Sequence, residues 1–205
     1  MNLAVALTAL VLIVPVELPD KTFIATLVLA TRFRPLLVWI GVGAAFVVQT
    51  VVAVTAGGLV AQLPHQPVVA FTAVMFLIGG IVLLRHAKRA DEEEAETEAE
   101  FGAKVKGPAR GWHVVATSFT VLFLAEWGDL SQLLTAGLVV RTKDPVSVFV
   151  GAVLGLLLVS GLGAAAGRTL LRYIKLATVQ RIGGGVCLLL AALSALQVVG
   201  VDLPI

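Results

Sequence analysis

The sequence has few charged residues and one cysteine, and each scarcity excludes a class of protein. Asp, Glu, Lys and Arg make up 14% of its 205 residues, whereas a soluble domain carries about 25%. Hydrophobic residues make up 59%, and the mean hydropathy is +1.00. The one cysteine, Cys187, cannot form an internal disulfide, and we expect it to be a small buried side chain. These values exclude a soluble globular domain and a disulfide-rich secreted one.

Long apolar segments take up most of the chain. Six can be marked, at about 3–31, 36–62, 68–84, 112–140, 146–167 and 178–200. A membrane helix needs about 20 apolar residues, and these segments lack the alternation of outer-membrane strands. The first segment has no basic leader or cleavage site, so we expect a retained membrane helix. The sequence therefore predicts an all-α integral membrane protein with six transmembrane helices in the lipid bilayer.

The charged residues gather between the third and fourth apolar segments. An acidic run extends from Asp91 to Glu100, with basic residues on both sides. We predict a solvated linker over 85–111, which separates a first three-helix repeat (1–84) from a second (112–205). A metal-sensing or cation-attracting role for the linker is the alternative hypothesis.

The two halves of the chain resemble each other. Residues 17–22 read Glu-Leu-Pro-Asp-Lys-Thr, and residues 126–131, at an offset of 109, read Glu-Trp-Gly-Asp-Leu-Ser. Further on, Ile-Gly-Gly at 78–80 is repeated at 182–184, at an offset of 104. Because each half holds an odd number of helices, the two copies must be inserted in opposite orientations. This is the inverted-repeat plan of many secondary transporters.

Each motif places two carboxylates inside an apolar segment, where one charge costs about 3 kcal/mol on insertion scales. Glu17 and Asp20 are three residues apart, as are Glu126 and Asp129, and on a helix that spacing puts both side chains on one face. Carboxylate oxygens suit Ca²⁺, Mn²⁺ or Mg²⁺. We therefore predict that these four residues form one metal site near the middle of the membrane.

The residue between the two carboxylates is Pro19 in the first motif and Gly128 in the second. Both residue types predict that the motif helices, the first and fourth, are broken or kinked. The broken helices would leave free carbonyls, which membrane depth tolerates only beside protein or a wet cavity. Side chains around the motifs are candidates for additional ligands or for supports of the ligands: Thr22, Ser131, Gln132, Lys21 and Gln49.

Four neighbouring carboxylates cannot all stay ionised without a cation. Since a carboxylate must lose its proton to bind a metal, the metal and protons should compete for the site. The residues thus predict exchange of one divalent cation against protons. Lys21 lies at ion-pair spacing from Glu17, whereas the second motif has Leu130 at that place, so the two halves differ in charge.

The basic residues predict the orientation of the chain. The loops near residues 32–34, 85–110 and 168–181 hold nearly all of the basic residues near the membrane, and the opposite loops hold only Arg141 and Lys143. The positive-inside rule then places the 85–111 linker in the cytoplasm and both termini outside. We expect a multi-pass protein of the cell membrane.

The duplicated motif resembles the signature of the GDT-type family of membrane cation exchangers, Glu-x-Gly-Asp-Lys/Arg-Ser/Thr, once in each half of a six-helix protein with a central acidic loop. The resemblance implies a non-enzymatic transporter that exchanges Mn²⁺, and in some members Ca²⁺, for protons by alternating access. Bacterial members look like manganese exporters. The metal is then a transported substrate and not a permanently bound cofactor. Two residues depart from the family pattern: Pro19 replaces a glycine, and Leu130 replaces a basic residue.

Other functions remain open at this point. An acidic site inside the membrane would also attract an amine, so an exporter of a small basic solute such as lysine is the second hypothesis. An intramembrane aspartyl hydrolase using Asp20 and Asp129 leaves the two glutamates without a role. A non-transporting scaffold protein and a homo-oligomeric assembly also stay open, and no nucleic-acid partner is expected.

Overall fold

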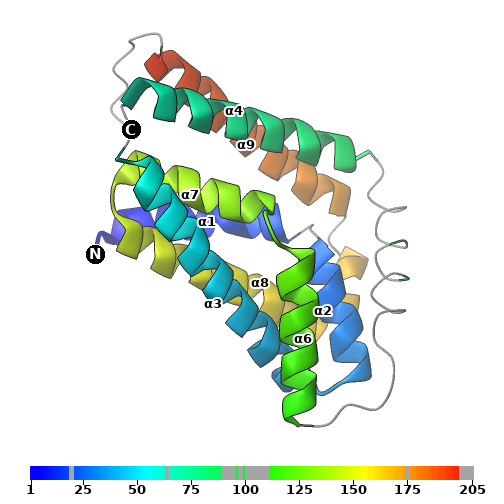
Figure 1. The fold of residues 1–205 in the computed structure, drawn as a ribbon. Helices are drawn as coiled ribbons and strands as arrows, with labels where there is room; N and C mark the ends of the chain where they lie inside the picture. Colours follow the sequence, from blue (N-terminus) through cyan, green and yellow to red (C-terminus); the bar gives the residue numbers. More distant parts are fainter. Residues whose placement is uncertain are drawn as a thin grey trace.

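The computed structural model describes residues 1–18, 21–62, 65–88, 111–173 and 176–198, together with Glu96 and Ala99. Throughout those ranges the regular structure is helical, which confirms the all-α prediction there. The helices are α1 (Leu3–Glu17), α2 (Lys21–Arg32), α3 (Pro35–Val60), α4 (His65–His86), α6 (Trp112–Ala125), α7 (Leu130–Thr142), α8 (Pro145–Tyr173) and α9 (Leu176–Val198) (Figure 1). Most of the predicted linker lies outside the described residues.

Two described helices are long and apolar enough to cross a membrane unaided. They are α3, with a hydropathy of 2.2, and residues 145–165 of α8, with a hydropathy of 2.3. Two pairs of helices are long and apolar enough when each pair is taken together, and each pair is bent at a break: α1 and α2 meet at 71°, and α6 and α7 meet at 72°. The described residues therefore hold two to four membrane spans, and the predicted breaks in both motif helices are present.

Each of the two long helices α3 and α8 begins at a proline, Pro35 or Pro145. Proline suits a first helical position because its missing N–H has no partner there anyway. At the start of α8, Asp144 accepts hydrogen bonds from the Ser147 N–H (3.1 Å) and hydroxyl (2.6 Å), and those bonds hold the pKa of Asp144 below its ordinary value. The N–H of Asn2 donates to Ser147 Oγ at 2.6 Å, so the start of α1 is tied to the start of α8.

The main contacts of the long helices α3 and α8 are repeated when the two halves of the chain are exchanged. Helix α1 packs on α8 as α6 packs on α3, and α2 packs on α8 as α7 packs on α3. The last helices of the two halves, α4 and α9, pack on each other and lie side by side along one side of the molecule in Figure 1. The repeat seen in the motifs therefore extends to the packing of the helices.

Close approach through glycine is repeated in the same way. A Cβ on Gly41 of α3 would meet the Val115 carbonyl and the Ser118 side chain of α6. A Cβ on Gly151 of α8 would meet the carbonyl of Ala6 and the side chain of Ala9 on α1. All three positions of the second contact correspond to those of the first, at an offset of 109 or 110. We call residues related by these offsets counterparts.

The pair α4 and α9 meets at the repeated glycines. A Cβ on Gly80 would lie 2.8 Å from the Leu188 side chain and 3.1 Å from the Gly184 carbonyl. A Cβ on Gly184 would lie 2.8 Å from the Leu84 side chain and 3.1 Å from the Gly80 carbonyl. The helices can approach this closely because neither glycine has a side chain. The two glycines that the sequence repeat relates, Gly80 and Gly184, are therefore also in contact with each other.

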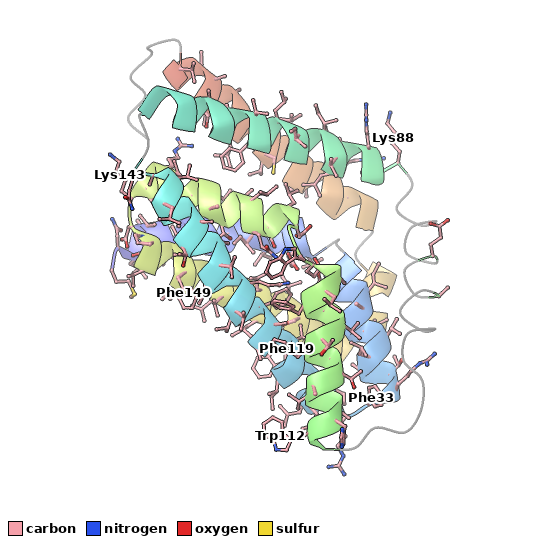
Figure 2. All side chains as sticks on the ribbon, viewed as in Figure 1. Phe33, Lys88, Trp112, Phe119, Lys143 and Phe149 are labelled. Atoms are coloured by element: carbon pink, nitrogen blue, oxygen red, sulfur yellow. The ribbon has the colours of Figure 1, made fainter. Side chains whose placement is uncertain are left out.

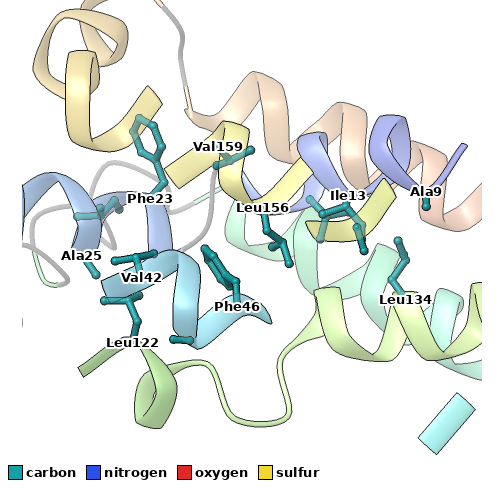
Figure 3. Packing of buried hydrophobic residues seen from close by; sticks show 14 of the residues in the cluster. Ala9, Ile13, Phe23, Ala25, Val42, Phe46, Leu122, Leu134, Leu156 and Val159 are labelled. Carbon is teal, nitrogen blue, oxygen red and sulfur yellow. The ribbon is translucent and has the colours of Figure 1, made fainter. Parts of the chain in front are cut away.

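The buried core lies where both halves meet. Figure 3 shows Phe46 of α3 close to Leu156 of α8. Ile13 of α1 and Leu122 of α6 belong to the same apolar cluster. Cys187 is buried, as predicted. Large apolar side chains elsewhere are exposed, including several on α1, α3, α4, α8 and α9. A surface of this kind is suited to lipid and not to water.

The loops between the helices lie at two opposite sides of the molecule. In Figure 2, Lys143 lies on one side of the molecule, and Lys88, Phe33 and Trp112 lie on the other. The N-terminus is on the side of Lys143, because Asn2 bonds the residues that begin α8. The loops around Phe33, Lys88 and Trp112 are the basic loops near 32–34 and 85–110, which the positive-inside rule predicts on one side of the membrane.

Candidate functional site

The breaks in the two bent spans place a glutamate at matched positions. Glu17 is the last residue of α1 and is fully buried, and Glu126 directly follows α6 and is 4% exposed. Neither position lies at the surface where a carboxylate would be solvated. A buried carboxylate inside a membrane span is costly, so its retention indicates a function. Asp20 and Pro19 of the first motif lie outside the described residues, as does the side chain of Lys21.

The second motif differs from the sequence-based expectation in one respect. Glu126 and Asp129 do not share a helix face, because α6 ends at Ala125 and Asp129 caps the start of α7. Gly128, between them, has a φ of +80°, and it lies in the break where the chain bends by 72° between α6 and α7. Asp129 Oδ2 accepts the N–H of Ser131 at 3.0 Å. The two carboxylates therefore stand on opposite sides of a turn.

Two glutamine side chains bind the carbonyls that this break sets free. Gln49 of α3 donates its Nε2–H to the Phe123 carbonyl at 3.1 Å. Gln132 of α7 donates its Nε2–H to the Glu126 carbonyl at 2.6 Å, and its Oε1 accepts the N–H of Gly128 at 3.3 Å. The last carbonyls of a helix have no intrahelical donor. Both glutamines, which the sequence marked as candidate ligands or supports, thus support the shape of the break.

The first break is built differently. The counterparts of Gln49 and Gln132 are Val159 and Phe23, which have no amide. Here the N–H of Leu18 donates to the Val14 carbonyl at 2.9 Å, so α1 continues one residue further than α6 relative to the motif. Val14 is the counterpart of Phe123. Its carbonyl therefore accepts a backbone N–H, whereas the carbonyl of Phe123 accepts the amide of Gln49.

The hydroxyl positions of both motifs are buried. Thr22 is 1% exposed and Ser131 is 6% exposed. One helical turn later lie Thr26 and Thr135, both also buried. Within the described part of the chain, the hydroxyls of Thr22 and Thr26 have no hydrogen-bond partner. Thr26 and Thr135 were not singled out from the sequence, although their spacing of four from Thr22 and Ser131 would have placed them on the same helix face.

A small polar pocket lies between α3 and α7. Its polar lining consists of Gln49, Thr50, Ser131, Gln132 and Thr135. Its apolar walls are Phe46, Ala53 and Leu156. Since Gln132 bonds the Glu126 backbone and Ser131 bonds Asp129, the pocket adjoins the second motif. We name it the amide pocket.

Of the two departures from the family signature, Pro19 lies outside the described residues, whereas Leu130 lies in a packed contact. Leu130 packs on α4, where a Cβ added to Gly79 would lie 2.5 Å from Leu130 Cδ1. A leucine at this place therefore joins α7 to α4, which a solvated basic side chain could not do. Trp127, at the position of the motif that the signature leaves open, is 60% exposed, and its ring centroid lies 5.0 Å from that of Phe123.

The four predicted metal-binding carboxylates are only partly described. Among the residues that the structure describes, no group of three His, Cys, Asp or Glu side chains is arranged to hold a metal ion. Asp20, one of the four, falls outside them. Convergence of the four carboxylates therefore stays a prediction.

Gly128 provides a test of the turn between the two carboxylates. Its positive φ strains any residue with a Cβ, although no atom lies within 4 Å of the place where a Cβ would stand. We expect Gly128→Ala to cost about 1–2 kcal/mol of stability, and Gly128→Asn to cost less because asparagine tolerates such a φ. Thermal unfolding of the detergent-solubilised variants measures both values. Equal stability of wild type and Gly128→Ala would contradict the strained turn.

Comparison with known proteins shows which family the chain resembles. Residues 5–91 and 114–201 match the family described as divalent cation/proton antiporter GDT1. The GDT1-like protein sll0615 of Synechocystis sp. is 33% identical over 198 residues, which cover 92% of this chain and 96% of that protein. No solved structure matches the chain.

The chain is also similar to two longer proteins. GDT1-like protein 4 of Oryza sativa subsp. indica is 32% identical over 82% of this chain and 64% of its own length. The chloroplastic PAM71-homolog of Arabidopsis thaliana is 30% identical over 86% of this chain and 55% of its own length. The buried motif glutamates at two breaks in apolar helices agree with these matches. The chain belongs to the GDT1 family of divalent cation/proton antiporters, and it is a multi-pass membrane transporter, not an enzyme.

Proposed function

We propose that this protein exports Mn²⁺, and also accepts Ca²⁺, in exchange for protons at a site formed by Glu17, Asp20, Glu126 and Asp129. The observation that carries the proposal is the burial of Glu17 and Glu126 at matched breaks in two bent membrane spans. Hard oxygen ligands suit both metals. The name of the family supports the proton as the exchanged ion.

The proposed exchange follows from competition for the same oxygens. A carboxylate binds a divalent cation only when it is deprotonated, so arrival of the metal releases protons and its departure takes protons up. Thr22 and Ser131 would add hydroxyl oxygens beside the carboxylates. Gln49 and Gln132 would hold the second break in shape, and Lys21 would balance part of the charge in the first motif only.

We further propose that the chain consists of two inverted three-helix repeats, 1–84 and 112–205, joined by the 85–111 linker. The exchange of helix contacts between the halves supports this arrangement, as do the paired contacts of Gly41 and Gly151. Inverted repeats allow one central site to open alternately to either side of the membrane. The linker would lie in the cytoplasm and both termini outside, in the cell membrane.

Reconstitution into liposomes tests the exchange. Acid-inside liposomes containing the protein should accumulate external Mn²⁺ and Ca²⁺, because outward proton flow drives inward cation flow. A protonophore should stop the accumulation, and liposomes without protein should show none. Accumulation that is equal with and without the proton gradient would refute the exchange. Accumulation of lysine in place of either metal would favour a basic-solute exporter instead.

A further inference from the structure

The amide pocket has a lining that is buried and polar. Gln49, Thr50, Thr135 and Ser131 are 3%, 2%, 2% and 6% exposed, and all four line the pocket together with Gln132. Buried polar side chains usually have a hydrogen-bond partner, most often the backbone or water. Here Gln49, Thr50, Gln132 and Thr135 donate to backbone carbonyls, which decides what the pocket can accept.

Four of the lining side chains each donate a hydrogen bond to a backbone carbonyl. Thr50 donates its hydroxyl to the Phe46 carbonyl at 2.7 Å, and Thr135 donates to the Ser131 carbonyl at 2.7 Å. The amides of Gln49 and Gln132 donate to the carbonyls freed at the break. A hydroxyl whose hydrogen is donated keeps its lone pairs, and an amide keeps its carbonyl oxygen. The lining therefore offers oxygen lone pairs that suit a cation, from the two threonine hydroxyls and the two amides, one of which also accepts the N–H of Gly128.

The other half of the protein lacks the two amides at the corresponding positions. The counterparts of Gln49 and Gln132 are Val159 and Phe23, and the counterpart of Thr50 is Ser160. Val159 and Phe23 are part of the apolar core. Two amide oxygens of one half are thus replaced by hydrocarbon in the other, so the neutral amide ligands are confined to the side of the second motif, whereas buried hydroxyls occur in both halves.

We propose that the amide pocket is a neutral subsite for the transported divalent cation, next to Glu126 and Asp129, and that it sets which cation is accepted. The inference rests on the proposed cation transport and adds its specificity determinant. Neutral oxygens can replace part of a hydration shell. Ca²⁺ accepts many such oxygens in flexible geometry, whereas Mg²⁺ gives up its waters reluctantly and demands an octahedral shell. The subsite therefore favours the more easily dehydrated cations over Mg²⁺.

The test removes the two hydroxyls and leaves the glutamine supports intact. The double variant Thr50→Val with Thr135→Val preserves side-chain shape. Thr55→Val is the matched control, because Thr55 lies on the same helix, is exposed, and makes the same bond to its own helix, to the Val51 carbonyl at 2.7 Å. Thr50→Ser with Thr135→Ser returns the hydroxyls. Each variant is reconstituted in liposomes and its KM and kcat are measured separately with Mn²⁺, Ca²⁺ and Mg²⁺.

We expect the double valine variant to raise the KM for Mn²⁺ and Ca²⁺ on the order of tenfold, with kcat and the weak response to Mg²⁺ little changed. The serine pair should restore the KM, and Thr55→Val should match wild type. Unchanged KM values in the double valine variant, with wild type transporting, would refute the subsite and leave the proposed function standing. A uniform loss for all cations would also refute it, as a structural effect. A wild type that moves no divalent cation would instead refute the proposed function.

Discussion

Replacing Glu126 by glutamine should lower divalent-cation transport on the order of 100-fold, with the protein still folded. Glu126 is 4% exposed at the break after α6, and its backbone carbonyl is held by Gln132. Glutamine keeps the side-chain shape but removes the charge that a dehydrated divalent cation needs. Glu17→Gln should have an effect of similar size, because Glu17 is fully buried at the corresponding break. Mn²⁺ uptake into acid-inside liposomes measures both losses.

Glu96→Gln is the control for the loss of one negative charge, because Glu96 is exposed and lies between the two halves. It should transport as wild type does. Thermal unfolding of each variant in detergent separates loss of function from loss of fold. Transport by Glu126→Gln within about twofold of wild type, a difference of only about 0.4 kcal/mol, would remove this residue from the site.

Adding one methyl group at Gly41 or Gly151 should destabilise the protein by about 3 kcal/mol. A Cβ at either position meets a backbone carbonyl of the neighbouring half, Val115 for Gly41 and Ala6 for Gly151. Backbone atoms in a helix cannot move aside as a flexible side chain does, so the two helices must separate. Thermal unfolding of Gly41→Ala and Gly151→Ala in detergent measures the cost.

The same helix α3 supplies a matched control. A Cβ on Gly58 would meet no atom within 4 Å. Gly58→Ala should therefore leave stability unchanged or raise it by about 0.5–1 kcal/mol, because alanine favours the helix over glycine. Costs that differ strongly between Gly41→Ala and Gly151→Ala would contradict the equivalence of the two helix contacts.

The class of the protein and its duplication were predictable from the sequence. Long apolar segments and scarce charge are local properties, and the offset of 109 between the motifs is visible without a fold. The breaks were predictable too, because Gly128 and Pro19 disfavour a continuous helix. The predicted common helix face of Glu126 and Asp129 was wrong, since helical spacing cannot be applied across a residue with a φ of +80°.

Contacts between distant residues were not predictable. Gln49 bonds the carbonyl of Phe123, 74 residues away, and nothing in the local sequence indicates that partner. Leu130 looked like the loss of a basic residue, whereas the structure packs it against Gly79 of α4. Both facts depend on how α3 and α4 lie against α7.

The sequence by itself determined that this chain is a duplicated membrane protein with carboxylates at the middle of two broken helices, because composition, spacing and helix-breaking residues act locally. The tertiary structure decided which oxygens of the amide pocket keep free lone pairs. It also decided that Val159 and Phe23, at the positions that correspond to the two glutamines, lie in the apolar core. Those properties arise only when α3 packs against α7 and α8 packs against α2, since hydrogen-bond partners are chosen by proximity in space and not along the chain.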